Sequence, residues 1–353
     1  MFDLIQLFLT FNCISVLLHI YFSENISGSN KTTILIYRFY YDQILIPELE
    51  IKKCPQSKKF IIIRSETVVD FDIVILHFME HEDFMKEYLT TKDRSKKIMI
   101  LFNFEPPHAA RKRFSYYRSR EHFFHWVYSY YETSYFYFPY GSYGKSKISN
   151  YKDRIIRQEF QKRKDSAVAI ISNCDTEHNG RLKYVMELQK YFLVDTYGRC
   201  FNSHISREDR EKILQSYKFV LSFENCNCQD YFTEKYWNAL IYGAIPIVLG
   251  HNKNFTQLIP GSYINVFDFT HPKYLSQHMR SISSDINEFK KYYQWKKKYF
   301  VLTDYFFIDS CVILSQISNM LAETIREDDT IHKIGNLSIC LDRETILRQT
   351  LST

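Results

Sequence analysis

Residues 217–250 read YKFVLSFENCNCQDYFTEKYWNALIYGAIPIVLG, and this stretch decides the fold class. It opens with a continuous apolar run at Lys218–Phe223, passes through a polar turn and continues into a helical pattern at Thr233–Tyr242. A second apolar run follows at Ala244–Leu249. Apolar runs without alternation are typical of strands that are buried on both faces. The stretch therefore predicts a strand–helix–strand unit of a parallel α/β sheet.

The same alternation of predicted strands and helices extends upstream of this stretch. Val168–Ile171 and Leu193–Tyr197 are predicted strands with a helix at Arg181–Tyr191 between them, and Gly198 turns the chain after the second strand. Nearer the N-terminus, four further apolar runs predict another parallel sheet: Thr33–Tyr37, Phe60–Ile63, Asp72–His77 and Lys97–Phe102. The chain therefore contains the elements of two doubly wound α/β units.

Length and composition set the expected domain plan. A chain of 353 residues has room for two cores, and its 45% hydrophobic content excludes a disordered protein. The highly charged stretch Lys145–Lys164 is interpreted as a connector or surface helix, so the boundary is expected near residue 150. We expect one domain at 33–150, a second at 151–300, and a C-terminal segment at 301–353 that packs back across both.

The charge balance narrows the class of ligand. The chain has 46 Lys and Arg residues against 40 Asp and Glu residues, which gives a net charge of +6. This mild positive charge suits an anionic ligand such as a nucleotide diphosphate. The sequence shows no basic stripe of the kind that binds nucleic acid, and its nine glycines form no G-x-G-x-x-G phosphate loop.

Polar residues gather where the strand at Lys218–Phe223 ends. Thr233 is predicted to be the N-cap of the following helix, whose free amides suit a diphosphate. Lys235 adds a full positive charge, and the Glu234 carboxylate can accept from two ribose hydroxyls. A capping acid and an exposed lysine on an ordinary amphipathic helix are the alternative interpretation of the same residues.

A second polar position follows a strand of the first sheet. The run Lys97–Phe102 leads into Asn103-Phe104-Glu105-Pro106-Pro107, where proline ends the strand. Because the carboxyl ends of parallel strands carry the ligand site, Glu105 is predicted to lie at such a site.

The eight cysteines do not by themselves predict a metal site. Cys13 lies in the N-terminal apolar stretch and seven lie in the part expected to fold. Cys226 and Cys228 are spaced C-x-C without paired histidines, which does not match a zinc site. The D-x-D triplet at 70–72 opens a predicted strand and is interpreted as structural. In an oxidising compartment some of the seven cysteines should pair and at least one should not, with the connectivity open.

The N-terminus indicates the compartment. Leu4–Phe22 spans 19 mostly apolar residues, close to the ~20 that cross a bilayer as a helix. We expect a short cytoplasmic tail at 1–3, a transmembrane signal anchor at 4–22 and a lumenal stem at 23–32. A cleaved signal peptide is the alternative, although no small-x-small cleavage site stands out. Four N-x-S/T triplets are predicted glycosylation sites: Asn25, Asn30, Asn254 and Asn336.

The stretch at 217–250 resembles the donor-binding signature of the α1,3-fucosyltransferase family. The resemblance covers roughly Ile98–Lys297. It includes Ser172-Asn173-Cys174, Arg181-Leu182-Lys183-Tyr184, Thr196-Tyr197-Gly198, Ile259-Pro260, Ser262-Tyr263-Ile264, Phe267-Asp268-Phe269 and Gln294-Trp295-Lys296. Upstream, Glu105-Pro106-Pro107 is similar to the family's acidic loop, and Phe138-Pro139-Tyr140-Gly141 is similar to its domain-closing segment.

This resemblance implies a GT-B architecture of two facing Rossmann-like domains. It implies inverting transfer of L-fucose from GDP-β-L-fucose to a GlcNAc hydroxyl of a glycan, in α1,3 linkage. Together with the apolar N-terminal stretch and the N-x-S/T triplets, it predicts a single-pass type II protein of the Golgi membrane with its catalytic part in the lumen. No cofactor is required, a divalent metal is at most a stimulant, and the acceptor is carried on a glycoprotein or glycolipid. The implied donor contacts are Arg181, Asn225, Tyr231, Glu234 and Lys235, and the implied general base is Glu105.

The chain departs from the family pattern at three places. Pro106 stands where the acidic loop usually has serine, and the usual C-terminal C-x-x-C is absent. Tyr130-Tyr131-Glu132-Thr133-Ser134-Tyr135 stands where two arginines and an acid are typical. The lost arginines motivate an alternative: a non-catalytic Golgi member of the family that binds donor or glycan without transfer.

Overall fold

The structure is a computed structural model. It describes residues 31–37, 53–78, 81–88, 97–114, 124–146, 152–174, 179–251, 255–302, 310–322 and 328–351. The expected tail, anchor and most of the stem, at 1–30, lie outside these residues, as do the triplet asparagines Asn25, Asn30 and Asn254. Among the helices in the described ranges, none combines the length and apolarity of a membrane-spanning segment.

The first sheet has six parallel strands in the order β2-β1-β3-β4-β5-β6. They are β1 (Thr32–Tyr37), β2 (Phe60–Ser65), β3 (Ile73–His77), β4 (Ile98–Asn103), β5 (Trp126–Ser129) and β6 (Phe136–Tyr137). The four apolar runs predicted as strands are confirmed as β1 to β4. The sequence patterns did not predict β5 and β6, which lie in a tyrosine-rich segment without a clear apolar run.

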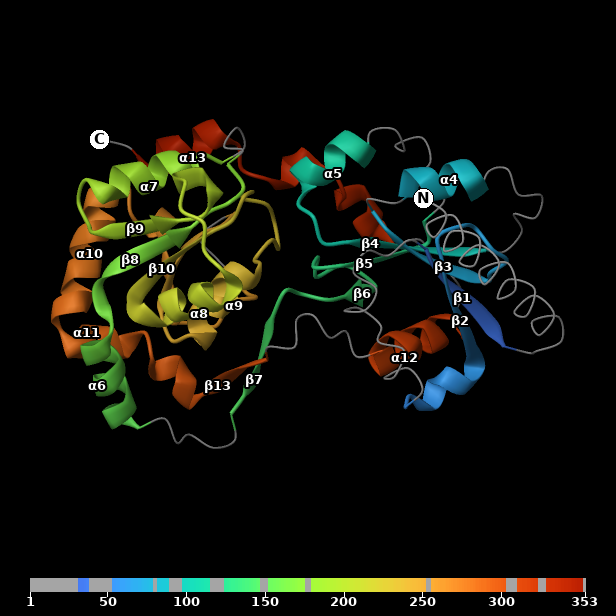
Figure 1. Ribbon diagram of the computed structural model, residues 1–353, viewed down its shortest axis with the longest axis horizontal. Helices are drawn as coiled ribbons and strands as arrows, with labels where there is room; N and C mark the ends of the chain where they lie inside the picture. Colours follow the sequence, from blue (N-terminus) through green and yellow to red (C-terminus); the bar gives the residue numbers. More distant parts are fainter. Residues whose placement is uncertain are drawn as a thin grey trace, which may run out of the picture.

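Helices cover both faces of this sheet (Figure 1). Helices α4 (His81–Tyr88) and α5 (Pro107–Phe114) share one core with Leu35 and Tyr37 of β1. The neighbouring residues Ile34 and Ile36 point to the other face, where they pack with α12 (Ser310–Met320). Successive strand residues alternate between faces, so a strand covered on both sides must be apolar throughout. This explains why these strands appear as continuous apolar runs.

The second sheet has five parallel strands in the order β12-β11-β10-β8-β9. They are β8 (Lys164–Ile170), β9 (Val194–Tyr197), β10 (Tyr217–Phe223), β11 (Ile245–Leu249) and β12 (Ile264–Asn265). The four strands predicted in this half are confirmed. Strand β8 begins before the apolar run that predicted it, since its first two residues are exposed and polar and do not belong to that run. The strand–helix–strand unit predicted from 217–250 is β10, α9 (Glu234–Ile241) and β11.

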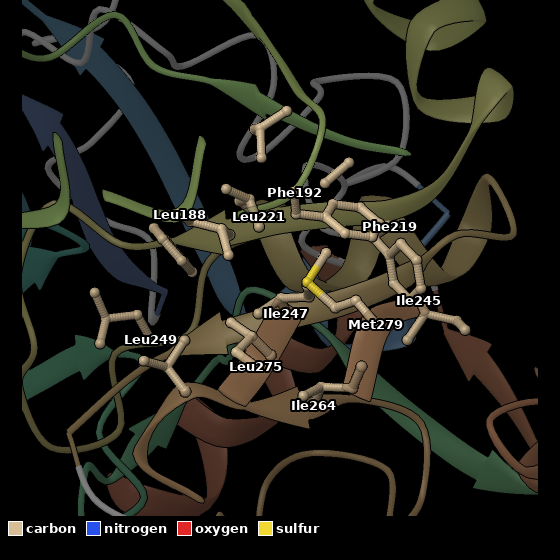
Figure 2. Close-up of a cluster of buried hydrophobic side chains, with 14 of the residues drawn as sticks. Leu188, Phe192, Phe219, Leu221, Ile245, Ile247, Leu249, Ile264, Leu275 and Met279 are labelled. Atoms are coloured by element: carbon tan, nitrogen blue, oxygen red, sulfur yellow. The ribbon is translucent and has the colours of Figure 1, made fainter. Parts of the chain in front are cut away.

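Two helical layers cover the second sheet. One face carries α7 (Arg181–Gln189), α10 (Pro272–Ser284) and α13 (Arg343–Thr350) in one continuous core. Figure 2 shows part of this core, in which Leu188 of α7 and Met279 of α10 meet Phe219, Leu221 and Ile247 of the sheet. The opposite face carries α8 (Arg207–Ser216) and α9. Two further helices, α6 (Asp153–Lys162) and α11 (Ile286–Lys291), add Ile156 and Phe289 to the core that contains α7, α10 and α13.

Short 3-10 helices complete the described secondary structure. They are η1 (Pro55–Lys59), η3 (Arg199–Phe201), η4 (Val266–Asp268), η5 (Gln294–Lys297), η6 (Asp329–Lys333) and η7 (Leu337–Ile339). Gly198, before η3, has φ +102°, and a Cβ there would lie 2.3 Å from the Ile171 carbonyl oxygen. A side chain at this turn would therefore have to displace backbone of the neighbouring segment.

The chain passes between the two sheets three times. It leaves the first sheet through β7 (Ser142–Lys145), which pairs antiparallel with β13 (Tyr299–Leu302) from the far end of the second half. After β13 the chain returns to the first half as α12, and it ends on the second half as α13. The two halves are therefore joined by several segments that are remote in sequence (Figure 1).

Three disulfides are formed among the described cysteines. Cys54 pairs with Cys311, Cys174 with Cys200, and Cys228 with Cys340. The first joins η1 to α12 beside the first sheet, and the third joins the turn after β10 to the C-terminal segment. Cys226 takes part in none of the three.

Candidate active site

Glu105 is presented by a tightly held loop after β4. The buried Asn103 side chain donates from Nδ2 to the Glu105 carbonyl oxygen at 3.2 Å and accepts the Glu105 N–H at 3.3 Å. The Tyr130 hydroxyl oxygen lies 3.4 Å from the same carbonyl oxygen, and Pro107 then starts α5. These bonds hold the backbone of the loop, and Glu105 itself is exposed.

The surroundings of Glu105 favour its protonated form. Although its surface is accessible, protein surrounds it on most sides, and this desolvation raises the pKa of its carboxyl above the ordinary 4.5. The positive charge of Lys235 opposes the rise, and the negative charge of Glu234 adds to it. Both residues belong to the second half of the chain, so the two halves meet electrostatically at Glu105.

A buried carboxylate organises the turn after β10. Glu224 is 1% exposed, and its Oε1 accepts the backbone N–H of Thr233 at 2.8 Å. The Thr233 hydroxyl also binds Glu224, at 2.9 and 2.8 Å from the two carboxylate oxygens. Thr233 is the N-cap residue of α9, as predicted, but its hydroxyl does not cap a helix amide. The side chain is instead committed to Glu224.

Lys235 is fixed above this carboxylate. Its Nζ lies 3.0 Å from Glu224 Oε2, 2.7 Å from the Thr233 hydroxyl and 3.3 Å from Glu234 Oε1. Burial alone would lower the pKa of Lys235, but the two carboxylates outweigh burial and raise it. Lys235 is therefore a permanently charged, oriented ammonium with a 25% exposed side chain, and the interpretation as an exposed surface lysine is wrong.

Glu234 begins α9 beside this ammonium. Burial tends to raise the pKa of its carboxyl, but Lys235 and Arg210 outweigh that effect and lower it. The Arg210 guanidinium approaches Glu234 Oε1 to 3.8 Å. Glu234 thus stays an ionised acceptor at the start of the helix.

Arg181 is buried at the start of α7 and holds two backbone segments. Its Nη1 donates to the Phe223 carbonyl at 3.0 Å and its Nη2 to the Asn173 carbonyl at 2.6 Å. Asn179 ties this corner to the turn after β10, because its Nδ2 donates to the Glu224 carbonyl at 2.6 Å. Burial lowers the pKa of Arg181, with the Glu224 charge acting in the opposite direction.

The buried polar atoms that lack hydrogen-bond partners within the described chain include Nε of Arg181, a donor, and Oδ1 of Asn225, an acceptor. Oδ1 of Asn227, in the same turn, and Nε of Arg210 are two others. Buried polar groups are normally paired, so an orphaned donor and acceptor beside an anion-compatible corner fit a polar ligand.

A group of buried tyrosines connects Glu105 to this turn. The Tyr231 ring lies 5.2 Å from the Tyr130 ring and 6.0 Å from the Tyr140 ring, measured between centroids. The Tyr140 hydroxyl donates to the Phe104 carbonyl, next to Glu105. Burial raises the pKa of both Tyr140 and Tyr231 well above 10, and the nearby carboxylates of Glu105 and Glu234 add to the rise. These hydroxyls therefore stay protonated.

The structure thus brings the six predicted site residues to one region where the halves meet. Arg181, Asn225, Tyr231, Glu234 and Lys235 surround the turn after β10, and Glu105 lies within electrostatic range of the last two. Sequence reasoning gave no role to Glu224, Asn179 or Arg210, and it named Tyr140 only as part of the segment similar to the family's domain-closing segment. Of these residues, Glu224 could have been found most readily from the sequence, because it is the first polar residue after a buried strand.

The segment 130–135, where the family pattern has two arginines, is held in place by buried aromatic rings. Tyr130 and Tyr131 are 1% and 0% exposed, and the Tyr130 hydroxyl donates to that of Tyr131 at 3.0 Å. Glu132 is exposed, and its backbone N–H donates to Asp230 Oδ2 at 3.4 Å. Rings rather than guanidinium groups therefore support the loop in this chain.

The remaining predicted groups have local roles. Asp72 Oδ2 accepts the Thr33 N–H at 2.7 Å and Asp70 pairs with Lys97 at 2.8 Å, so the D-x-D triplet is structural as predicted. Asn336 caps η7 by accepting the Ser338 N–H at 3.0 Å.

In the described part of the chain, one group has atoms that could hold a metal ion. His108, Cys226 and Cys228 place their ligand atoms within 4.8 Å of one another. Since the Cys228 sulfur is already bonded to Cys340, an imidazole and one thiol remain, fewer than the four ligands of a structural zinc site.

Two family models match the chain. Residues 160–336 match "Glycosyltransferase family 10 (fucosyltransferase) C-term", and residues 29–141 match "Fucosyltransferase, N-terminal". Together they cover both halves of the structure and include all six predicted site residues.

The chain is also similar to curated proteins that are named as fucosyltransferases. It is 40% identical over 151 residues to glycoprotein 3-alpha-L-fucosyltransferase A of Drosophila melanogaster, covering 41% of this chain and 30% of that protein. It is 35% identical over 134 residues to 4-galactosyl-N-acetylglucosaminide 3-alpha-L-fucosyltransferase 9 of Mus musculus, covering 37% of each. The chain thus spans about a third of the length of the curated relatives that it matches.

Solved structures share the fold. An alpha1,3-fucosyltransferase with GDP-fucose matches with a TM-score of 0.50 at 15% identity, covering 86% of this chain and 95% of that one. The same enzyme type with GDP matches with a TM-score of 0.51 at 15% identity, covering 86% and 94%. At this identity the match supports the α/β fold of the two parallel sheets.

Proposed function

Since the chain belongs to glycosyltransferase family 10, the fucosyltransferases, we propose that it transfers L-fucose from GDP-β-L-fucose to a GlcNAc hydroxyl of a glycan, in α1,3 linkage with inversion. The names of the two curated relatives, both 3-alpha-L-fucosyltransferases, support this reaction class. In this proposal the two sheets are the facing Rossmann-like domains of a GT-B enzyme, with the reaction between them.

One observation carries the proposal: Glu105 lies within electrostatic range of the Lys235–Glu234 pair, across the contact between the halves. Inverting transfer needs a base on the acceptor side and positive charge at the departing diphosphate. The structure has an accessible carboxylate from the first half and an oriented ammonium from the second half in one place.

The geometry supports a set of proposed donor contacts. Lys235 meets the diphosphate, and Glu234 accepts hydrogen bonds from ribose hydroxyls. Asn225 Oδ1 and Arg181 Nε, both without partners in the described chain, supply further polar contacts. Tyr231 provides the buried ring against which the donor is held.

In the proposed step, Glu105 takes the proton of the acceptor hydroxyl as its oxygen forms the bond to fucose C1. The bond from C1 to the diphosphate oxygen, which lies on the opposite face of C1, breaks at the same time, and GDP leaves with the electron pair. Lys235 stabilises the charge that develops on GDP, so the reaction requires no cofactor for this purpose. The raised pKa of Glu105 makes it a stronger base than an ordinary carboxylate.

We also propose that the reaction takes place in the Golgi lumen, with the chain held as a type II membrane protein by residues 4–22. The three disulfides support an oxidising compartment. The acceptor would then be a glycan of a glycoprotein or glycolipid, and the four triplet asparagines would be glycan attachment sites.

To test the proposal, GDP release from GDP-fucose is measured with the full-length chain in detergent. A panel of N-glycan cores and lactosamine chains serves as acceptors. Glu105→Gln should lower transfer by about 10²- to 10⁴-fold, the contribution of a general base, while GDP-fucose binding persists. Full activity in Glu105→Gln would overturn the assignment of the base. Stronger competition by GDP-mannose or a UDP-sugar than by GDP-fucose would overturn the donor.

The replaced arginine pair favours one second candidate. If Tyr131 and Glu132 mark a lost acceptor contact, the protein would bind donor or glycan in the Golgi without transfer. The same panel distinguishes the candidates, because this one gives GDP-fucose binding and no GDP release with any glycan.

A further inference from the structure

Outside the proposed reaction, a thiol and a disulfide lie side by side next to the turn after β10. The Cys226 sulfur lies 3.0 Å from Nδ1 of His108, in α5. Both atoms and the Cys228 sulfur are within 4.8 Å of one another, and Cys228 is bonded to Cys340. A thiol, a base and a disulfide are therefore in one cluster built from three segments of the chain.

Cys226 lies in an apolar core cluster but has a basic side chain in contact and a cation nearby. His108 contacts it directly, and the Arg181 guanidinium is a cation within electrostatic range. The Tyr131 hydroxyl also lies within electrostatic range of Cys226. Reactive cysteines characteristically lie beside His, Lys or Arg, whereas inert buried cysteines have apolar surroundings. The 2% exposure of Cys226 hinders attack on external molecules but not on a sulfur inside the same cluster.

We propose that these residues form an internal thiol–disulfide exchange site. Cys226 is the attacking thiol, His108 accepts its proton, and Cys228–Cys340 is the bond that opens. The proposal rests on the position of the sulfurs and does not depend on fucose transfer.

The exchange balances without an outside oxidant or reductant. The Cys226 proton moves to His108, and the thiolate attacks the Cys228 sulfur. A Cys226–Cys228 bond forms as the Cys228–Cys340 bond breaks, and Cys340 leaves with the electron pair as a thiolate. Cys340 then takes up a proton, and His108 returns its proton to solvent. The number of disulfides and thiols is the same before and after.

The exchange would change how the C-terminal segment is held. That segment pairs with the turn after β10 through the Gln229 N–H to the Ile339 carbonyl at 2.9 Å and the Leu341 N–H to the Asn227 carbonyl at 2.8 Å. After exchange these hydrogen bonds remain without a covalent bond beside them, and the turn is closed on itself by Cys226–Cys228. Since Asn225 and Tyr231 flank this turn, the disulfide state bears on the same loop that carries predicted donor contacts.

The experiment traps the product in the native protein. The oxidised full-length chain in detergent is incubated at about pH 8 with excess maleimide, quenched in acid, digested with pepsin and mapped by mass spectrometry. We expect maleimide on Cys340, which is half-buried and becomes a thiol on exchange, together with a Cys226–Cys228 link. Trapping removes the product, so even a small exchanged population accumulates.

Two variants serve as controls. Cys226→Ser should leave Cys340 unmodified, because the variant lacks the thiol that lies beside the Cys228–Cys340 bond. His108→Asn should slow modification of Cys340 about tenfold or more, with Cys54–Cys311 and Cys174–Cys200 intact as evidence of folding. Maleimide on Cys226 alone, or no modification with Cys228–Cys340 intact, would overturn the proposal. One equivalent of zinc that is lost in Cys226→Ser would also overturn it, in favour of a metal site.

Discussion

The two regions that meet at the candidate site are held in different ways. In the second half, a buried carboxylate, Glu224, binds Thr233 and Lys235, so the geometry of the functional groups rests on charge. In the first half, the backbone around Glu105 is held by the hydroxyls of Tyr130 and Tyr140, so its geometry rests on packed rings and neutral hydrogen bonds.

This difference has a physical consequence. A buried ion network is costly to leave half-made, because a carboxylate without its partner stays desolvated. A neutral tyrosine network loses less when one hydroxyl is removed, since the ring contact remains. We therefore expect the second half of the site to respond to single substitutions in stability and donor binding, and the first half to respond mainly in turnover.

The largest expected effect on stability comes from removing the disulfides. Cys54–Cys311 closes a sequence separation of 257 residues, and Cys174–Cys200 closes one of 26. Removing the first with Cys54→Ala/Cys311→Ala should lower the free energy of unfolding by about 5.5 kcal/mol, and removing the second with Cys174→Ala/Cys200→Ala by about 3.5 kcal/mol. Denaturant unfolding followed by fluorescence measures both. An equal or reversed order would show that loop length does not govern how the halves are held.

The next effect tests the charged network. Glu224→Gln keeps the shape of the side chain but removes the charge under Lys235, and it should cost about 2–3 kcal/mol of stability and weaken GDP-fucose binding. The matched control is Glu187→Gln, which breaks an exposed pair with Lys190 and should change stability by less than about 0.5 kcal/mol. Denaturant midpoints and isothermal titration give the two readouts. Equal effects in the two variants would remove the distinction between the regions.

A smaller effect tests the tyrosine network. Tyr140→Phe removes the hydroxyl bound to the Phe104 carbonyl and should cost about 1 kcal/mol of stability. It should also lower kcat about three- to tenfold with donor affinity unchanged, because the loop that carries Glu105 loosens. Tyr236→Phe in the second half is the control: its hydroxyl binds Ser262 Oγ at 2.7 Å, and its loss should affect stability alone. A fall in kcat in both variants would argue against a special role for Tyr140.

The smallest effect is a shift in pH dependence. The base must be ionised, and desolvation raises the pKa of Glu105, so kcat/KM should fall as pH drops through a midpoint above 4.5. Initial rates across the acid range, with GDP-fucose affinity measured in parallel, locate this midpoint. The residual activity of Glu105→Gln should lack it. A midpoint at or below 4.5 would mean that Lys235 outweighs desolvation at this carboxylate.

The sequence predicted the second half better than the first. The stretch 217–250 contains the end of β10, the N-cap of α9 and the pair Glu234–Lys235, so strand, helix and donor residues were all visible in one local pattern. In the first half, β5 and β6 were missed, because buried tyrosines such as Tyr128 and Tyr130 do not stand out as an apolar run.

Local pattern by itself determined the two parallel sheets, the position of Glu105 at a strand end and the family resemblance, because strand periodicity and a long motif are properties of neighbouring residues. Only the tertiary structure decided which cysteines pair, that Glu224 rather than solvent holds Lys235, and that Tyr140 and Tyr231 bring Glu105 to the donor turn. These contacts join residues from 11 to 257 positions apart. Their partners are chosen by how the sheets and the returning C-terminal segment pack, which local propensity does not encode.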